Sequence, residues 1–380
     1  MEVYFDNSAT TKPYKEVAQV VYNTMLEAYG NPSSLHSMGK DAEDMLSSAR
    51  EYLARTVNCT PKELYFTSGG TESDNLAIIG YAMANKKRGN KIISQKTEHK
   101  AVLESLAYLE KNGFEIVLLD TDLDGFIDVS LLEAEINENT LLVSIMYVNN
   151  ETGAIMPVEE IASLTKKWGC ALHVDAVQAY GKVDINVKKQ GIDMLSLSAH
   201  KIHGPNGVGA LYIKNGLKVN PVIYGGQQEG SIRSGTENLA GIMGFKKSAE
   251  ITFSDMNKKC QDLEALKNYL KQSLECNIHD VVINSPENSV CNILNVSFVG
   301  VKSEVLLHVL ESKGIYVSTG SACNSKKNKY SYVLKSMGLK DNVIDSAVRF
   351  SFSEFNTKDE VDYTVNVLKK EVEILRKIMR

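Results

Sequence analysis

Short apolar runs alternate with segments of helical periodicity along most of the chain, and this alternation is the strongest constraint on its fold. The runs lie at residues 63–67, 91–94, 115–119, 141–148, 171–174, 193–198 and 209–213. Apolar strands separated by helices predict an α/β fold with a mostly parallel sheet that helices cover on its faces. Ligands of such sheets bind at the carboxyl ends of the strands, so we expect the reactive residues there.

The pattern changes near residue 246. Residues 246–275 are charge-rich and helical, and a strand, a helix, two strands and a helix follow at 293–298, 303–313, 316–318, 348–353 and 357–379. This order predicts a second, smaller α+β domain. The last helix opens with a capping box, Thr357 to Glu360, and its apolar residues recur at alternating spacings of four and three. A coiled coil with a partner would explain that spacing, but the repeat is short, which favours packing against the chain's own sheet.

The composition excludes several classes of protein. The 380 residues include 42 Lys plus Arg and 47 Asp plus Glu, so the basic excess typical of a nucleic-acid binder is missing. The N-terminal residues lack the basic and apolar regions of a signal peptide, and the longest apolar run, about eight residues, is far too short to cross a membrane. The six cysteines form no CxxC pair and no zinc-type cluster. We therefore expect no metal site and reduced thiols in a cytoplasmic protein.

Lys201 and Asp175 are the first candidates for chemistry. Lys201 follows the apolar strand at 193–198 and precedes a loop with Gly204 and Pro205. Poor hydration at a strand end lowers the pKa of a lysine and frees its amine for Schiff-base chemistry. Asp175 ends another apolar strand 26 residues earlier, a distance that fits one strand–helix–strand unit and allows the two side chains to meet in one crevice. A carboxylate beside such a lysine suits pyridoxal phosphate, because it keeps the ring nitrogen protonated. Taken alone, Lys201 could point to solvent and Asp175 could cap a helix.

Two further turns follow predicted strands. Residues 67–75 pass from a strand through Gly69 and Gly70 into a helix, and the free N–H groups of such a turn bind anions. An ordinary strand-to-helix turn would have the same pattern. His99 comes just after the strand at 91–94, where an imidazole can stack on a flat ring and exchange protons. The alternative for His99 is a surface histidine at the start of a helix.

Cys323 is the candidate for a reactive thiol. It lies in a polar, Lys-rich stretch and is flanked by small residues. Nearby positive charge favours the thiolate form of a cysteine. We interpret the other five cysteines as structural: Cys59, Cys170, Cys260, Cys276 and Cys291.

Taken together, these stretches resemble the cysteine desulfurases, which are pyridoxal-phosphate enzymes of the class V aminotransferase group. The motifs run in family order from residue 6 to about residue 375 and comprise DNSATT at 6–11, GNPSS at 30–34, TSGGTESDN at 67–75, TEHK at 97–100, VNNE at 148–151, HVDA at 173–176, SAHKIHG at 198–204, RSGTEN at 233–238, GSAC at 320–323 and VRF at 348–350. The resemblance implies fold type I of the pyridoxal-phosphate-dependent transferases. It also implies a large domain at 14–255 and a small domain made of 1–13 and 256–380, with a catalytic loop at about 320–332.

The resemblance implies roles in binding pyridoxal phosphate. Lys201 would form the Schiff base, Asp175 would pair with the ring nitrogen, Gln178 would hydrogen-bond the phenolic oxygen, and His99 would stack on the ring. The phosphate would be held by residues from several motifs: Gly70, Thr71, Ser198, His200 and, from the other subunit of a homodimer, Thr236.

The resemblance also implies roles in the reaction. Asn150 and Arg349 would position L-cysteine, with a bidentate grip of Arg349 on the α-carboxylate. Cys323 would take the sulfur as a persulfide and leave L-alanine. An acceptor protein would then receive the sulfur for iron–sulfur cluster assembly or tRNA thiolation.

Two departures from the family pattern affect loops. A basic residue that the family often has is replaced by Gly230, and the usual Leu-Glu-Pro-Ser of the catalytic loop is replaced by residues 328–331, Asn-Lys-Tyr-Ser. The first departure changes local loop contacts. The second makes the loop basic and therefore affects which acceptor protein it fits.

Three other functions remain open on the sequence. A selenocysteine lyase or a general aminotransferase is a related enzyme, and a transaminase would not depend on Cys323. A non-enzymatic docking or sensory protein is expected to lack Lys201 or Cys323, yet both are present. A plain globular α/β protein would bind no cofactor.

Overall fold

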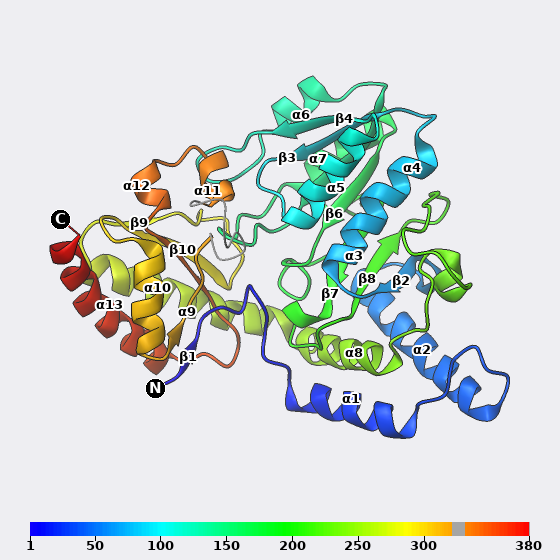
Figure 1. Cartoon of the computed structure of the whole chain (residues 1–380), viewed down its shortest axis with the longest axis horizontal. Coiled ribbons are helices and arrows are strands. Elements are labelled where there is room, and N and C mark those ends of the chain that lie inside the picture. The colour runs from blue at the N-terminus through cyan, green and yellow to red at the C-terminus, as the bar shows by residue number, and fades with distance from the viewer. Residues whose placement is uncertain (321–330, 380) are drawn as a thin grey trace.

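A seven-stranded sheet forms the centre of the larger part of the molecule (Figure 1). The computed structural model describes residues 1–320 and 331–379. In spatial order the strands are β2 (Leu64–Thr67), β8 (Gly209–Ile213), β7 (Met194–Ser198), β6 (Ala171–Asp175), β5 (Thr140–Met146), β3 (Lys91–Gln95) and β4 (Glu115–Leu119). The strands from β7 to β4 are parallel, while β8 runs antiparallel to both of its neighbours. This arrangement confirms the predicted mostly parallel α/β sheet.

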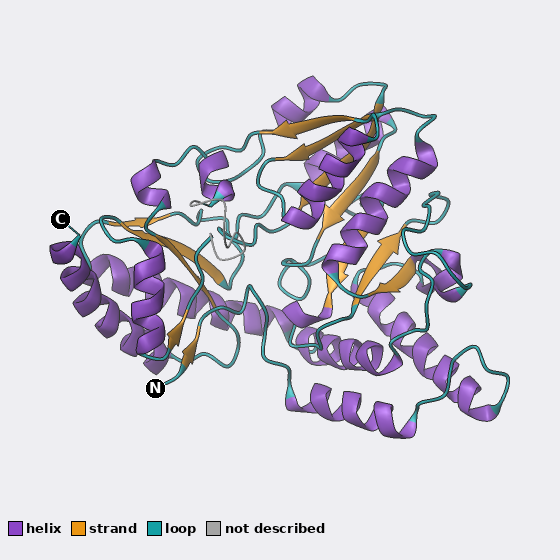
Figure 2. Cartoon of the chain, viewed as in Figure 1, coloured by secondary structure: helices purple, strands orange, loops and turns teal. Residues whose placement is uncertain are grey.

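Helices cover both faces of this sheet (Figure 2). The buried apolar side chains form one cluster on each face, because successive residues of a strand point to opposite sides. One cluster includes α2 (Ser37–Thr56), α6 (Val129–Glu135), α7 (Val158–Trp168) and α8 (Leu239–Phe253), and α1 (Lys15–Glu27) packs on α8. The other cluster includes a π-helical turn (Leu76–Gly80), α4 (Tyr81–Asn85) and α5 (Lys100–Lys111). Helix α3 (Gly70–Asn75) leads directly into the π-helical turn, so that α3, this turn and α4 form one continuous helical run.

The C-terminal part has a hydrophobic core of its own. Its antiparallel sheet has the order β12 (Ala347–Ser351), β10 (Ile293–Phe298) and β9 (Val281–Ile283), and β1 (Val3–Tyr4) pairs separately with β11 (Ile315–Tyr316). The helices here are α9 (Met256–Asn277), α10 (Ser303–Ser312), α11 (Tyr332–Ser336), α12 (Asp341–Ile344) and α13 (Lys358–Ile378). Phe298, Phe350 and Phe352 lie at the centre of this core. The exact domain boundaries remain a prediction.

Helix α13 forms as predicted. Thr357 Oγ1 accepts from the N–H of Glu360, and the Glu360 carboxylate accepts from the N–H of Thr357, which completes the capping box. The apolar stripe is buried in the same core as α9, α10 and β12. The stripe therefore packs against the chain's own domain, as favoured over a coiled coil.

Residues 246–275 are helical and contain no strand, as predicted, and they belong to two helices, since α8 ends at Phe253 and α9 begins at Met256. The connection between β6 and β7 differs from the prediction. No helix joins β6 to β7, because residues 176–193 form a series of turns. Gly181 and Gly191 have φ of +76° and +69° in this connection, which a continuous helix does not allow.

The segment at residues 6–11 connects the two parts of the molecule. The Asn7 side chain donates to the carbonyl oxygen of Ser351 at 2.9 Å, and the Ser8 N–H donates to the Ser351 hydroxyl at 2.8 Å. On the other side, the Thr11 hydroxyl donates to the carbonyl oxygen of His200 at 2.8 Å. The segment is thus fixed between the small sheet and the end of β7.

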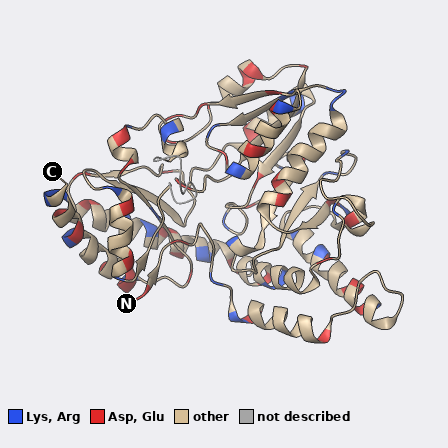
Figure 3. Cartoon of the chain, viewed as in Figure 1, with Lys and Arg blue, Asp and Glu red and all other residues tan. Residues whose placement is uncertain are grey.

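The surface of the described residues shows no single dominant charge. Basic and acidic residues are interspersed over both parts of the chain (Figure 3). Within residues 1–320 and 331–379, no helix is both long and apolar enough to cross a bilayer.

Candidate active site

A cavity of about 420 Å³ lies where the central sheet meets the smaller part of the molecule. Its wall includes the last residues of three neighbouring parallel strands: Met146 of β5, Asp175 of β6 and Ser198 of β7. Arg349 of β12 closes the cavity from the other part. The cavity therefore lies at the carboxyl ends of the strands, where ligands of parallel sheets bind.

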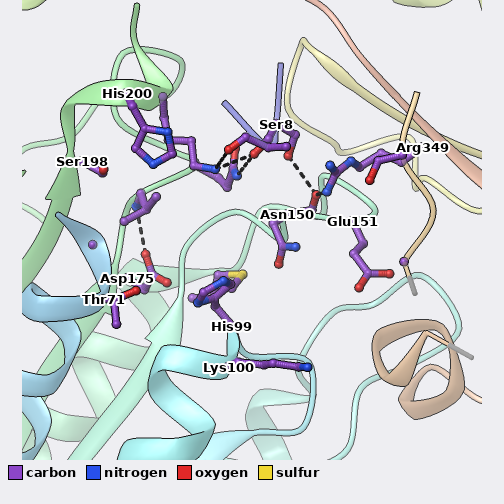
Figure 4. Close-up of a pocket in the computed structure, with 18 of the residues that line it drawn as sticks. Ser8, Thr71, His99, Lys100, Asn150, Glu151, Asp175, Ser198, His200 and Arg349 are labelled. Atoms are coloured by element: carbon purple, nitrogen blue, oxygen red, sulfur yellow. Dashed lines mark hydrogen bonds between the residues drawn. The ribbon is translucent and has the colours of Figure 1, made fainter. Parts of the chain in front are cut away.

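Most of the predicted site residues line this one cavity. They are Gly70, Thr71, His99, Asn150, Asp175, Gln178, Ser198, His200, Lys201 and Arg349. Figure 4 shows Thr71, Asp175, Ser198 and His200 on one side, Asn150 and Arg349 on the other, and His99 between them. Thr236 is exposed and does not line the cavity of its own chain. Cys323 lies outside the described residues.

Lys201 lies in a short 3-10 turn, Ala199–Lys201, that directly follows β7. Its Nζ donates to the carbonyl oxygens of Ser8 and Ala9 at 2.6 and 2.7 Å. Burial, together with the nearby cations Arg349 and Lys182, lowers the pKa of the Lys201 amine to about 7. About half of these amines are then uncharged at neutral pH, which is the form that attacks a carbonyl.

Asp175 and His99 form the middle of the cavity. Asp175 Oδ1 accepts from the N–H of Val177 at 2.9 Å, so this carboxylate caps a turn and also faces the cavity. Burial raises the pKa of Asp175, and the Val177 N–H, His99 and Lys201 offset this rise only in part. His99 begins α5, and its Nδ1 accepts from the N–H of Ala101 at 3.1 Å. Burial lowers the pKa of His99, so a neutral imidazole in a fixed orientation faces the cavity.

The side of the cavity near Ser198 has the features of an anion site. Gly70 and Thr71 open the helical run that continues to Asn85, so the first N–H groups of a helix point toward this side. The Ser198 hydroxyl is buried and has no hydrogen-bond partner among the described residues. His200 Nδ1 lies 3.1 Å from the Thr10 hydroxyl, and burial lowers the pKa of His200 to about 4.

Glycine is required at position 70 by close packing. A Cβ atom there would lie 2.6 Å from Cγ2 of Val177, the residue that follows the strand end at Asp175 by two positions. The turn can therefore approach the segment after β6 only without a side chain, which keeps its N–H groups at the cavity.

Arg349 dominates the opposite side of the cavity. One terminal nitrogen donates to the carbonyl oxygen of Asn150 at 2.9 Å, and the other donates to Asp6 at 2.7 Å. Arg349 Nε and Asn150 Oδ1 are buried and have no partner among the described residues. Buried unpaired polar atoms are costly, so a donor and an acceptor remain for a ligand here.

Several residues of the site were not predicted from the sequence. Asp6, Ser8, Asp74 and Glu151 also line the cavity. Asp6 and Glu151 belong to motifs that were recognised, but the sequence carried no signal that their side chains reach this cavity. Glu151 accepts from the Ser331 hydroxyl at 2.5 Å, and burial raises its pKa.

The loop around Gly230 is anchored by an ion pair. Both carboxylate oxygens of Glu229 accept from Arg50 at 2.7 Å, and one also accepts from the N–H of Phe66 at 2.8 Å. Gly230 has a φ of +62°, which glycine adopts without strain. The replacement of a basic residue by Gly230 thus fits the conformation of this loop.

Comparisons with known proteins agree on one family. The model of the aminotransferase class-V family matches residues 3–364. A "Cysteine desulfurase IscS" from Dictyoglomus turgidum is 43% identical over 378 residues, which are 99% of this chain and 96% of that relative. A protein of the same name from Methanosarcina thermophila is 43% identical over 98% of this chain and 93% of its own length.

Solved structures give the same result. A structure described as "NIFS-LIKE PROTEIN" superposes with a TM-score of 0.93 at 38% identity and covers 99% of this chain and 100% of its own. A second structure, "SspA in complex with cysteine", has a TM-score of 0.83 at 33% identity and covers 93% of this chain and 100% of its own.

Proposed function

The chain belongs to the aminotransferase class-V family and is a pyridoxal-phosphate-dependent cysteine desulfurase, and we propose that the cavity at the strand ends is where it acts on L-cysteine. The observation that carries the proposal is the buried amine of Lys201, with its lowered pKa, in a cavity with an anion site on one side and a buried arginine on the other. The expected fold type I agrees with this family.

The residues of the cavity fit pyridoxal phosphate. The cofactor supplies an electron sink for carbanion chemistry. The helix start at Gly70 and Thr71, together with the unpartnered Ser198 hydroxyl, would hold its phosphate. Asp175 would face the ring nitrogen, whose positive charge would offset the cost of burying the carboxylate.

Three side chains would orient the cofactor and move protons. The His99 imidazole would stack on the ring, since its hydrogen bond to the α5 backbone fixes its plane. Gln178 is buried and donates to the Ser8 carbonyl oxygen at 2.9 Å, and its amide would also hydrogen-bond the phenolic oxygen of the cofactor. Lys201 would accept and return protons at the substrate carbons, because its pKa of about 7 lets it do both near neutral pH.

Arg349 and Asn150 would bind the amino acid. The free Nε–H of Arg349 would donate a hydrogen bond to the α-carboxylate. The unpartnered amide oxygen of Asn150 would accept a hydrogen bond from the amino acid. L-cysteine is also the ligand named in the description of the related SspA structure.

We assign the acceptance of sulfur to Cys323 on the sequence alone. The C–S bond of L-cysteine breaks, an S–S bond to Cys323 forms, and L-alanine leaves while the enzyme retains a persulfide. An acceptor protein would then take the sulfur. The name of the relatives favours iron–sulfur cluster assembly as the pathway, and tRNA thiolation is the other candidate.

We also propose a homodimer. Large apolar side chains are exposed on and after α1, namely Tyr22, Met25, Leu26, Tyr29 and Leu35, and such a group of side chains is typical of an interface. The exposed position of Thr236, away from its own cavity, fits a role in the phosphate site of a second subunit. Lys201→Ala and Thr236→Ala chains, each impaired alone, should restore activity when they are mixed, because one intact site then forms. Activity that does not exceed the sum of the separate variants would contradict shared sites.

The test of the function measures two products together. Protein incubated with L-cysteine and a reductant should release sulfide and L-alanine in equal amounts. Lys201→Ala should abolish both products and the yellow colour of the bound cofactor. If Cys323→Ala kept full sulfide release, the nucleophile would be wrong, and transamination in place of alanine formation would favour a general aminotransferase.

A further inference from the structure

We propose that Asp6 is a positioning residue for substrate recognition, which acts by orienting the guanidinium of Arg349 toward the α-carboxylate of the amino acid. The proposal rests on the proposed binding of L-cysteine in this cavity. It assigns a task to a carboxylate that lines the cavity and that the proposed reaction does not otherwise use.

The contacts of Arg349 fix the guanidinium at two of its three nitrogens. One terminal nitrogen donates to the Asn150 carbonyl oxygen at 2.9 Å, and the other donates to Asp6 Oδ1 at 2.7 Å. The third nitrogen, Nε, is buried without a partner among the described residues. The Arg349 side chain is 10% exposed and that of Asp6 is 22% exposed, so both lie largely out of bulk water.

The backbone holds Asp6 in place independently of its side chain. The Asp6 carbonyl oxygen accepts from the N–H of Ala9 at 3.0 Å, and Asp6 forms a bridge with Ser351 of β12. The carboxylate is therefore a fixed acceptor beside the arginine. The Asn150 carbonyl provides the second fixed acceptor on the other terminal nitrogen.

These two contacts decide which donors remain for the substrate. A guanidinium has five N–H groups and grips a carboxylate through two neighbouring ones. With one hydrogen of each terminal nitrogen engaged, Nε–H and one hydrogen on each terminal nitrogen remain. Without Asp6 the guanidinium could rotate about its last side-chain bonds, and Nε–H would lose its fixed direction.

A purely structural role for Asp6 makes a different prediction. The ion pair would then only hold residues 6–11 against β12, and its loss would affect all ligands of the cavity equally. A positioning role affects only ligands with a carboxylate. L-alanine and L-alaninamide separate the two roles, because the amide has the same shape but lacks the negative charge.

The experiment measures the dissociation constants of both ligands for the cofactor-loaded enzyme from the change in its visible absorbance. Asp6→Ala should weaken L-alanine about tenfold and change L-alaninamide less than about twofold, because it removes one charge-assisted contact of Arg349. Asp6→Asn should restore binding of L-alanine to within about twofold, since the amide oxygen accepts the same hydrogen bond. Asp262→Asn, which removes an exposed carboxylate on α9, is the control that should change neither ligand.

Three results would overturn the inference: equal weakening of both ligands by Asp6→Ala, no weakening of either ligand, or weakening by Asp6→Asn as large as that by Asp6→Ala. Arg349→Ala separates this failure from failure of the proposed function. If that variant leaves the affinity for L-alanine unchanged, the carboxylate site itself is wrong. If it weakens L-alanine while Asp6→Ala does not, only the role of Asp6 is wrong.

Discussion

The lowered pKa of Lys201 predicts how this residue reacts in the cofactor-free protein. An ordinary lysine has a pKa of 10.5 and Lys201 has one of about 7, mainly because of burial. At pH 7.5 about three-quarters of the Lys201 amines are uncharged, against about one in a thousand for an ordinary lysine. Only the uncharged amine reacts with an acylating reagent, so the reactivity of Lys201 should rise with a midpoint near pH 7.

Two substitutions should move this midpoint in opposite directions. Arg349→Ala removes a nearby cation that disfavours protonation, so the pKa of Lys201 should rise. Asp6→Asn removes an anion that favours protonation, so the pKa should fall. Each shift should be a fraction of a unit up to about one unit, because burial is the larger cause and remains in both variants.

The assay is trace acetylation with acetic anhydride between about pH 5.5 and 10.5, followed by mass spectrometry of the peptides. Lys258, which is exposed on α9, is the internal reference for the yield of acetylation. A midpoint above about 9 for Lys201, or shifts of both variants in the same direction, would refute the reasoning. The same titration implies that activity should decline as the pH falls below about 7, because Lys201 is then protonated and loses its free electron pair.

Three further predictions concern stability and packing. Glu229→Gln should cost about 3–5 kcal/mol of unfolding free energy, measured by denaturant titration, because it leaves the Arg50 guanidinium without its buried partner; a loss below about 1 kcal/mol would mean that the pair does not anchor the loop. Gly320→Ala should lower the melting temperature by a few degrees and reduce alanine formation, since its Cβ would lie 2.4 Å from Glu151 Oε2; unchanged values in both assays would contradict that close approach. Phe298→Ala should cost about 3–5 kcal/mol and speed hydrogen exchange in β10, β12 and α13 more than in β5 and β6, because Phe298 belongs to the smaller core only; equal acceleration everywhere would show that the two cores unfold as one.

The sequence predicted the central sheet well, because most residues of its strands are apolar. Every residue of β5, β6, β7 and β8 is buried, so each appears in the sequence as a short, mainly apolar run, although polar residues such as His173 and Ser196 interrupt β6 and β7. The rule that ligands bind at the carboxyl ends of parallel strands then agreed with the choice of Asp175 and Lys201 as candidates. The lowered pKa expected for Lys201 follows from the same burial.

Contacts between segments that lie far apart in the chain could not be predicted from local sequence patterns. No local pattern shows that Asp6 reaches Arg349, because the two residues are 343 positions apart. The turns at 176–193 were mistaken for a helix, since spacing alone does not reveal a glycine with positive φ. The long helix α2 was missed because its buried face alternates small residues with Leu46 and Leu53 on an otherwise polar segment.

The pairing of Ser8 with Ser351 has a consequence for biosynthesis. The two residues are 343 positions apart, so a chain that leaves the ribosome in order exposes Ser8 long before its partner exists. The helices and strands of the central sheet can fold during that interval, but the segment that carries Asp6 and Ser8 cannot yet form its contacts with Ser351 of β12. Catalytic competence should therefore appear only after β12 has emerged, as the last step of maturation rather than a gradual gain.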